Sequence, residues 1–191
     1  GAAIVQALQS IVSRNLSPVD CGVVSITQFN AGEACNVIPQ TATLRGTARA
    51  FSPDVRDQLE AGIRRIACGV AAAHDVAAVV SYRRGYPPTV NTSVEADFCA
   101  MVGRELMGEG AVHTSYPPSM GAEDFAYMLE QRPGCYVWLG NGGGPGAALR
   151  PGHEEGGGCM LHNPRYDFND DIIPLGVAYW TRLVERYLAR D

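Results

Sequence analysis

One short apolar segment in the second half of the chain constrains the fold more than any other feature. Residues 135–140 read Cys-Tyr-Val-Trp-Leu-Gly, so an extended backbone there carries apolar side chains on both sides. Such a strand is typical of a sheet that is covered on both faces. A buried strand cannot satisfy its own backbone hydrogen bonds. Because residues 89–191 otherwise favour helices, we infer that they belong to a larger domain whose remaining strands lie outside this chain.

The rest of this half is predicted to be helical, with loops. Helices are predicted near residues 93–107, 122–131 and 171–190, a short strand near 112–115, and a glycine-rich loop over 141–158. The run Tyr86-Pro87-Pro88 interrupts the pattern before them, because a residue that precedes proline is biased away from the helical region. The chain of 191 residues is therefore divided into two domains, 1–86 and 89–191.

The first domain is predicted to place helices on one face of a small antiparallel sheet. Residues 41–51 alternate between small apolar side chains and the polar side chains of threonine and arginine, as in a strand with one exposed face. Strands are also predicted at 21–29 and 76–82, and a first helix at 1–13. A second helix is predicted to begin at Ser52-Pro53-Asp54, since serine is a favoured N-cap and proline a favoured first helical residue.

The composition excludes several kinds of chemistry. All 15 basic residues are arginine, so this chain contains no phosphate-loop lysine and no Schiff-base lysine. The net charge of −5 argues against nucleic acid as a partner, and no apolar run is long enough to cross a bilayer. The six cysteines form no Cys-x-x-Cys pair, which favours free, mostly buried thiols in a reducing, cytoplasmic compartment.

Metal-capable side chains crowd residues 153–162, at His153, Glu154, Glu155, Cys159 and His162. Their spacing matches no zinc finger or ribbon, so solvent-exposed loop residues are a stronger interpretation than a self-contained metal site. A Cys159–His162 nucleophile pair would lack a third, orienting group. His162 alone has a better claim, since Pro164 stiffens the turn after it. The spacing leaves open whether His162 is a fixed ligand or an ordinary loop histidine.

Two further segments could bind an anionic ligand. Gly121 precedes Glu123 and Asp124 at a predicted helix start, where a ligand carboxylate could approach the backbone; the helix dipole alone also explains the two acids. Asn36 precedes the strand that carries Arg45 and Arg49, and arginine binds carboxylates with two parallel hydrogen bonds. A turn asparagine followed by exposed strand arginines is the alternative interpretation.

Five segments follow one another in an order that carries more information than any one of them. They are Asn36-Val37-Ile38-Pro39 with Gly46-Thr47-Ala48-Arg49, then Ser119 to Phe125, then Gly134 to Asn141, then Leu161 to Asn169. Together they resemble the C-terminal half of a family of metal-dependent amidohydrolases and metallopeptidases. This family includes hippurate hydrolases, N-acyl-amino-acid amidohydrolases (aminoacylases) and auxin-conjugate hydrolases. The resemblance covers essentially the whole chain.

The resemblance implies an enzyme of mixed α+β and α/β fold. Residues 1–86 would be a two-layer lid, two helices on an antiparallel sheet that lacks its first strand, through which the protein would form a homodimer. Residues 89–191 would be the C-terminal portion of an α/β catalytic domain. The family cleaves the amide bond of N-acyl amino acids with a divalent metal pair (Zn, Mn, Co or Ni), metal-activated water and a glutamate general base.

The resemblance also assigns roles to individual residues. His162 matches the family's last metal ligand. Asn36 and Arg49 match lid positions that approach the substrate carboxylate, and Gly121 and Glu123 match a segment that lines the pocket. The other metal ligands and the general base belong to the family's upstream half. We therefore expect that this chain alone carries no catalytic base, binds no metal pair and is inactive.

Two other hypotheses remain open at this stage. One is a non-enzymatic dimerisation or binding module that lacks the catalytic half. The weaker one is a small zinc protein that uses residues 153–162. The sequence does not fix the acyl group, the amino acid or the native metal.

Overall fold

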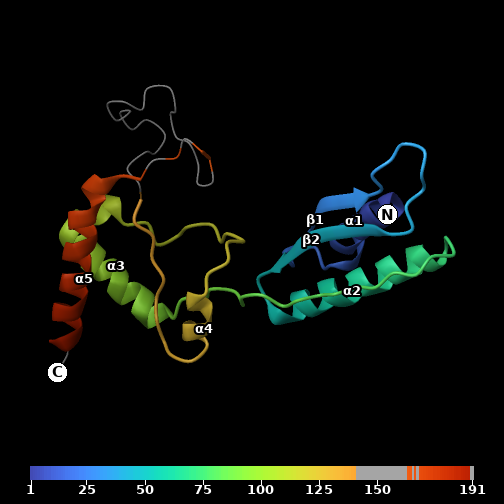
Figure 1. Cartoon of the computed structure of the whole chain (residues 1–191). Helices are drawn as coiled ribbons and strands as arrows, with labels where there is room; N and C mark the ends of the chain where they lie inside the picture. Colours follow the sequence, from blue (N-terminus) through green and yellow to red (C-terminus); the bar gives the residue numbers. More distant parts are fainter. Residues whose placement is uncertain (141–162, 165, 167, 190–191) are drawn as a thin grey trace. The chain divides into compact units, whose positions relative to one another are not determined.

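The structure is a computed structural model that describes residues 1–140, 163–164, 166 and 168–189 (Figure 1). The chain divides into two compact units. The first unit comprises residues 1–89 and 118–127, and the second comprises residues 90–117 and 128–191. The described residues form an α+β structure, in which helices accompany a two-stranded antiparallel sheet.

The first unit packs two helices against this sheet. Strands β1 (Gly22–Ala31) and β2 (Ala42–Ala50) pair in antiparallel register. Helix α1 (Ala2–Ser10) continues into a π-helical turn, η1 (Ile11–Asn15), and helix α2 spans Pro53–Ala72. One apolar core joins these elements, made by Leu8, Ile11, Val24, Val55, Leu59 and Ile66. Both long strands and both helices of the predicted first domain are therefore confirmed.

Strand β2 keeps the predicted alternation. Leu44, Ala48 and Ala50 are half-buried, whereas Arg45 and Arg49 on the other face are exposed. The pairing shifts between Ile26 and Gln28 of β1, which is a β-bulge. Beside it, a Cβ atom at position 46 would lie 2.1 Å from the Ser25 carbonyl oxygen, so the strands can approach this closely only at glycine.

Helix α2 begins as the sequence predicts. Ser52 has an extended backbone, and its Oγ accepts a hydrogen bond from the Val55 amide at 3.3 Å. Pro53 follows at the first helical position, where its missing amide proton costs nothing. Serine at this position satisfies one of the helix's unpaired amides.

Replacing Ser52 with alanine should therefore lower the free energy of unfolding by about 1 kcal/mol, because the Val55 amide loses its acceptor. Chemical denaturation followed by circular dichroism measures the change. Ser52→Asp is the matched control, since aspartate also caps helices. Equal losses in the two variants would show that the cap does not stabilise the helix.

The prediction of a strand at 76–82 is wrong, but the predicted alternation of buried and exposed side chains is observed. The segment forms no ladder with β1 or β2, yet Ala78, Val80 and Tyr82 are half-buried, whereas the residues between them are exposed. The carbonyl oxygen of Val80 accepts a hydrogen bond from Arg64 of α2 at 2.8 Å. The segment therefore lies along α2 without a partner strand, and pairing is what makes an extended segment a strand.

The second unit is built on two packed helices. Helices α3 (Ser93–Met107) and α5 (Ile173–Leu188) bury Phe98, Val102, Tyr179 and Leu183 between them. Short 3₁₀ turns lie at η2 (Glu109–Ala111) and η3 (Asp170–Ile172). The predicted helices at 93–107 and 171–190 are thus confirmed. No helix among the described residues is both long and apolar enough to span a bilayer.

Two predicted strands of this half are not formed in the described residues. Residues 112–115 are irregular, and so are residues 135–140. The latter segment is not buried on both faces, since Trp138 is 61% exposed and Val137 is also exposed. The physical reason is the lack of a neighbouring strand in the part of the chain that the structure describes.

The predicted helix at 122–131 is shorter than expected. Helix α4 spans only Phe125–Leu129. At its start, the amides of Ala126 and Tyr127 donate to the carbonyl oxygens of Glu123 and Asp124, three residues earlier. Such tight turns replace the first helical turn, so Gly121 does not lie at the N-terminus of a long helix. Gly121 lies four residues before the start of the observed helix.

Candidate functional site

The structure brings two of the predicted substrate-binding segments together within the first unit. Arg49 extends from the exposed face of β2, and its Nη1 donates a hydrogen bond to the Met120 carbonyl oxygen. Gly121 follows Met120 directly. The hydrogen bond fixes the direction of the guanidinium group and holds its Nη1 at the residue before Gly121.

The charge of Arg49 is not neutralised by any carboxylate among the described residues. Other arginines of the same unit are engaged differently. Arg84 pairs with Asp57 at 2.8 Å and with Glu60 at 2.9 Å, and Arg64 also pairs with Glu60 at 2.9 Å. Arg49 is thus an exposed cation that is held in place by a neutral carbonyl group. An arginine of this kind is suited to bind an anion, above all a planar carboxylate.

The Glu60 carboxylate on α2 forms ion pairs with arginines of the first unit. Hydrogen bonds from Arg64 and then from Arg84 hold the pKa of Glu60 below its ordinary value. These ion pairs lie on the surface of α2, where Glu60 binds Arg64 of the same helix and Arg84 of the segment that follows it. They therefore stabilise the local surface and leave Arg49 available.

Gly121 lies in open space. A Cβ atom there would meet only the Ser119 Oγ, at 3.6 Å, which is ordinary van der Waals contact. Packing within the described residues therefore does not require glycine at this position.

The other two predicted substrate-binding residues, Asn36 and Glu123, form no side-chain hydrogen bond or ion pair with Arg49 in the described part of the chain. Asn36 is exposed in the loop between β1 and β2, next to a turn closed by the Val37 amide and the Ala34 carbonyl oxygen at 3.4 Å. Glu123 is half-buried, and its backbone carbonyl oxygen accepts the Ala126 amide. The described contacts join Arg49 to Met120, the residue before Gly121, but give no direct contact between Arg49 and Asn36 or the Glu123 side chain.

His162 and the cluster at His153, Glu154, Glu155 and Cys159 lie outside the described residues. Among the residues that are described, no group of three or more His, Cys, Asp and Glu side chains could hold a metal ion. The described part of the chain therefore does not form a metal centre by itself.

Sequence reasoning missed two features of these units. One is the Met120 carbonyl oxygen, a backbone acceptor that no side-chain pattern reveals. The other is the proximity of Cys99 and Cys135, which no short spacing announces. The prediction of mostly buried thiols is wrong for the described cysteines, because Cys21, Cys35 and Cys68 are exposed and lie outside the cores.

Comparison with known proteins places the chain in a defined group. Residues 6–186 match the model of peptidase family M20/M25/M40. The chain is 35% identical over 185 residues to the hippurate hydrolase of Campylobacter jejuni, covering 97% of the chain and 45% of that protein. It is 35% identical over 191 residues to the IAA-amino acid hydrolase ILR1-like 2 of Arabidopsis thaliana, covering 98% of the chain and 40% of that protein.

Solved structures agree with the sequence relatives. A putative aminohydrolase from methicillin-resistant Staphylococcus aureus superposes with a TM-score of 0.75 at 26% identity, over 98% of this chain and 46% of that one. The YXEP protein of Bacillus subtilis, described as a dinuclear metal binding peptidase from the M20 family, gives a TM-score of 0.71 at 26% identity, over 98% and 45%. The chain thus spans less than half the length of each of these proteins.

Proposed function

The chain belongs to peptidase family M20/M25/M40, and from this membership we propose that it is part of an enzyme that hydrolyses the amide bond of N-acyl amino acids. The resemblance to hippurate, N-acyl-amino-acid and auxin-conjugate hydrolases agrees with this family. Relatives named hippurate hydrolase and N-acetylcysteine deacetylase support the substrate class. The observation that carries the proposal is the exposed guanidinium of Arg49, which is held by the Met120 carbonyl oxygen and has no carboxylate partner among the described residues.

The chain's own contribution is to bind and orient the substrate. Arg49 accepts the substrate's free carboxylate in two parallel hydrogen bonds, and Asn36 donates to the same end of the molecule. The open backbone at Gly121 lets the substrate lie close to the chain. Glu123, in the same segment, lines the substrate pocket. A fixed carboxylate holds the amide bond at a set distance from the groups that cleave it.

The catalytic groups are proposed to lie in the rest of the whole protein. The described residues offer no metal centre, whereas the YXEP protein is described as binding two metals. We propose a divalent metal pair (Zn, Mn, Co or Ni) for the whole protein, with His162 as the ligand that this chain supplies. The general base is likewise expected outside this chain.

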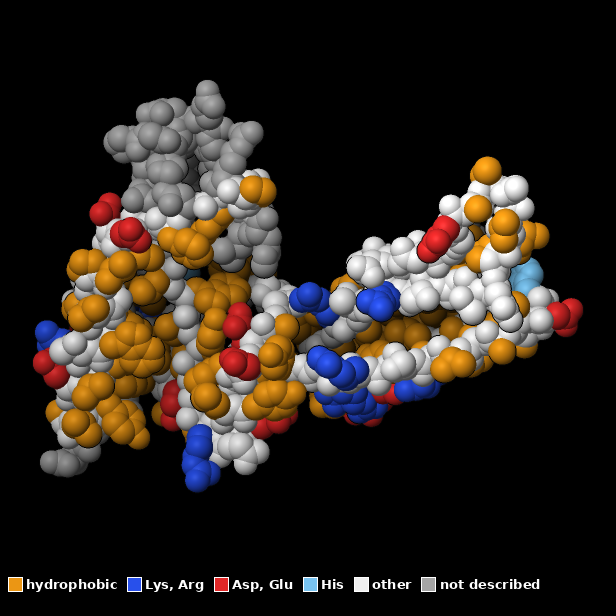
Figure 2. All heavy atoms as spheres, viewed as in Figure 1, with side chains coloured by type: hydrophobic (Ala, Val, Ile, Leu, Met, Phe, Trp, Pro, Cys, Tyr) orange, Lys and Arg blue, Asp and Glu red, His pale blue; other side chains and the backbone are white. Residues whose placement is uncertain are grey.

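The second unit supports its assignment as part of a larger catalytic domain. Helix α5 buries Tyr179 and Leu183 against α3, yet it exposes Val177, Trp180 and Val184 along another face. Figure 2 shows hydrophobic side chains gathered over this unit. A continuous apolar stripe on a helix is ordinarily covered by other structure. We propose that the first unit is the lid and that the second is the C-terminal portion of the catalytic domain.

The whole protein is proposed to be a cytoplasmic homodimer that joins through the first unit. The free thiols of the described cysteines fit a reducing compartment. The outer edges of β1 and β2 are unpaired in the two-stranded sheet of the described residues, and such edges offer backbone groups for pairing. Analytical ultracentrifugation of the whole protein tests this: a monomer at micromolar concentration contradicts the dimer.

Activity measurements test the proposed function. The whole protein, supplied with Mn²⁺ or Zn²⁺, should release glycine from N-benzoylglycine or the corresponding amino acid from other N-acyl amino acids. The 191-residue chain alone should show no turnover and no stoichiometric metal binding. Robust turnover by the chain alone would overturn its assignment as a part. Failure of the whole protein on all such substrates would favour the non-enzymatic module.

Replacing Gly121 with alanine tests the substrate-binding role of the open backbone. The free energy of unfolding should change by less than about 0.5 kcal/mol, because the added methyl group meets only the Ser119 Oγ. The KM of the whole enzyme should rise about tenfold, because that methyl group occupies the space that the substrate needs. Gly85→Ala is the matched control, since a Cβ there meets no atom within 4 Å. Equal KM values for the two variants would contradict the role.

A further inference from the structure

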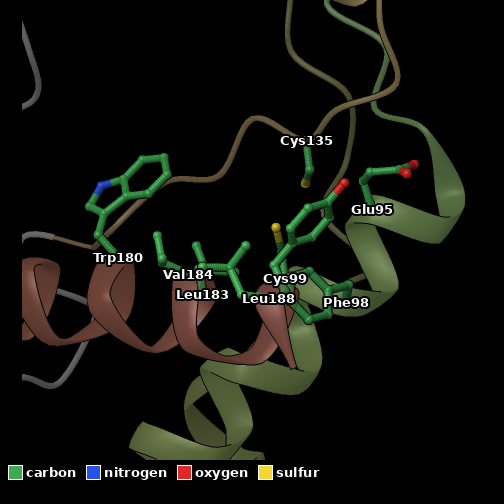
Figure 3. Close-up of a pocket in the computed structure, with 9 residues that line it drawn as sticks. Glu95, Phe98, Cys99, Cys135, Trp180, Leu183, Val184 and Leu188 are labelled. Carbon is green, nitrogen blue, oxygen red and sulfur yellow. The ribbon is translucent and has the colours of Figure 1, made fainter. Parts of the chain in front are cut away.

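Two cysteines that lie far apart in the sequence meet in the second unit. Cys99 belongs to α3, and Cys135 lies in the extended segment that precedes residue 141. Both side chains line the same pocket, where Figure 3 shows them, and the Cys99 thiol is close enough to raise the pKa of Cys135. Both are half-buried and carry free thiols. The geometry therefore presents a pair of neighbouring thiols.

The backbone holds this pair together. The residue before Cys135 is bound to Thr92, since the Thr92 amide donates to the Gly134 carbonyl oxygen at 3.0 Å and the Gly134 amide donates to the Thr92 Oγ1 at 3.2 Å. The residue after it is bound to Asn91, which exchanges hydrogen bonds of 2.8 and 2.9 Å with Tyr136. Asn91 and Thr92 come directly before α3. Both neighbours of Cys135 are thus anchored to the start of the helix that carries Cys99.

The two cysteines line a pocket whose other side chains are mostly apolar. The pocket has a volume of about 380 Å³ and is lined by Cys99 and Cys135 together with Glu95, Phe98, Trp180, Leu183, Val184, Tyr187 and Leu188 (Figure 3). The Tyr179 hydroxyl donates to the Cys99 carbonyl oxygen at 3.0 Å and gives the pair a further anchor on α5. Among the described residues, this pocket extends to both cysteines.

We propose that Cys99 and Cys135 are a reversible modification site, which a hydroperoxide closes to a disulfide. One thiolate attacks the O–O bond of hydrogen peroxide, and after proton transfer its sulfur becomes a sulfenic acid while water leaves. The second thiol then attacks that sulfur, the S–S bond forms, and a second water molecule leaves. Two thiols and one hydrogen peroxide thus give one disulfide and two water molecules. A dithiol reductant reverses the step by thiol–disulfide exchange.

The rate of closure should be limited by ionisation. Burial, the Cys99 thiol and the carboxylate of Glu95 together raise the pKa of Cys135 to about 12. Two tyrosines of α5 also face the pair among the described residues: Tyr187 lines the same pocket, and the Tyr179 hydroxyl has a pKa that is raised mainly by burial. Since thiolate is the reacting form, closure should be slow at neutral pH and should accelerate up to about tenfold per pH unit above it. A rate that does not change with pH would contradict closure through these thiols.

Peptide mapping tests the site. The 191-residue chain and the whole protein are each treated with hydrogen peroxide, alkylated, digested and analysed by mass spectrometry. The Cys99–Cys135 link should predominate in native buffer and disappear with dithiothreitol. In guanidinium chloride, Cys21–Cys35 and Cys135–Cys159 should predominate, because an unfolded chain closes shorter loops more readily. The same mixture of links under both conditions, or free Cys99 and Cys135 after oxidation, would overturn the proposal.

Variants separate the pair from the other thiols. Cys99→Ser and Cys135→Ser should each abolish the native link, whereas Cys68→Ser, on the exposed surface of α2, should leave its yield unchanged. Asn91→Ala removes one side of the backbone anchor, so closure should slow several-fold while alkylation of Cys68 keeps its rate. If Cys135 is oxidised to a disulfide as completely in Cys99→Ser as in the unmodified chain, then its partner is a different cysteine and the proposal is contradicted.

Discussion

Replacing Arg49 with alanine in the whole enzyme is expected to lower kcat/KM for an N-acyl amino acid about 100-fold. The guanidinium is held by the Met120 carbonyl oxygen and has no carboxylate partner among the described residues. Its proposed partner is the substrate's own carboxylate. Two charge-assisted hydrogen bonds to that group are lost in the variant, and about 3 kcal/mol of binding corresponds to a factor of about 100. Steady-state kinetics with N-benzoylglycine measure the loss.

Two further variants show whether this loss is specific. Arg49→Lys keeps the charge but not the planar pair of donors, so it should recover only part of the activity. Arg83→Ala removes the same charge from an exposed position of the same unit and should change kcat/KM by less than about twofold, as expected for a screened surface charge. A comparable loss in Arg49→Ala and Arg83→Ala would mean that net charge, rather than a bound carboxylate, explains the effect.

The largest loss of stability is expected for Leu59→Ala in the first unit. Leu59 lies on α2, is 0% exposed and contacts the core that joins both helices to the sheet. Truncating a fully buried leucine removes its apolar contacts and leaves a cavity, which costs about 2–5 kcal/mol of the free energy of unfolding. Urea denaturation followed by far-ultraviolet circular dichroism measures the change.

Ile38→Ala is the control for this substitution. Ile38 is 95% exposed in the loop between β1 and β2, so its truncation should cost less than about 0.5 kcal/mol. If Leu59→Ala costs no more than Ile38→Ala, the packing of α2 against the sheet is not what stabilises the first unit.

The elements that could be predicted from the sequence are those that local chemistry determines. Ser52 and Pro53 mark the start of α2, because an N-cap and a first-turn proline act within a few residues of each other. The alternation in β2 predicts which side chains face the core. Helix α3 was predicted with the observed bounds.

The elements that could not be predicted depend on distant partners. The alternation at 76–82 and the apolar run at 135–140 both suggest strands, yet neither segment has a neighbouring strand among the described residues. Helix α4 spans only Phe125–Leu129 and starts with three-residue hydrogen bonds, which its composition does not reveal. The side-chain pattern of a segment can favour a strand, but only the tertiary structure shows whether a neighbouring strand pairs with it.

The candidate site shows the same division. Arg49 and Gly121 could be singled out from residue type and position, but their proximity depends on a bond between a side chain of β2 and a backbone carbonyl group far along the chain. The proximity of Cys99 and Cys135 cannot be predicted from the sequence, because it depends on the backbone anchors at Asn91 and Thr92. His162 lies outside the described residues, and its proposed role rests on the family resemblance.

One crossed measurement tests the central claim, that the whole protein cleaves N-acyl amino acids whose carboxylate Arg49 binds. The unmodified enzyme and Arg49→Ala are each assayed on N-benzoylglycine and on its primary amide, which lacks the carboxylate charge. The unmodified enzyme should prefer the acid about 100-fold, and Arg49→Ala should lose most of that preference while cleaving the amide at an unchanged rate. If the preference persists in Arg49→Ala, or if the unmodified enzyme cleaves neither compound, the account is contradicted.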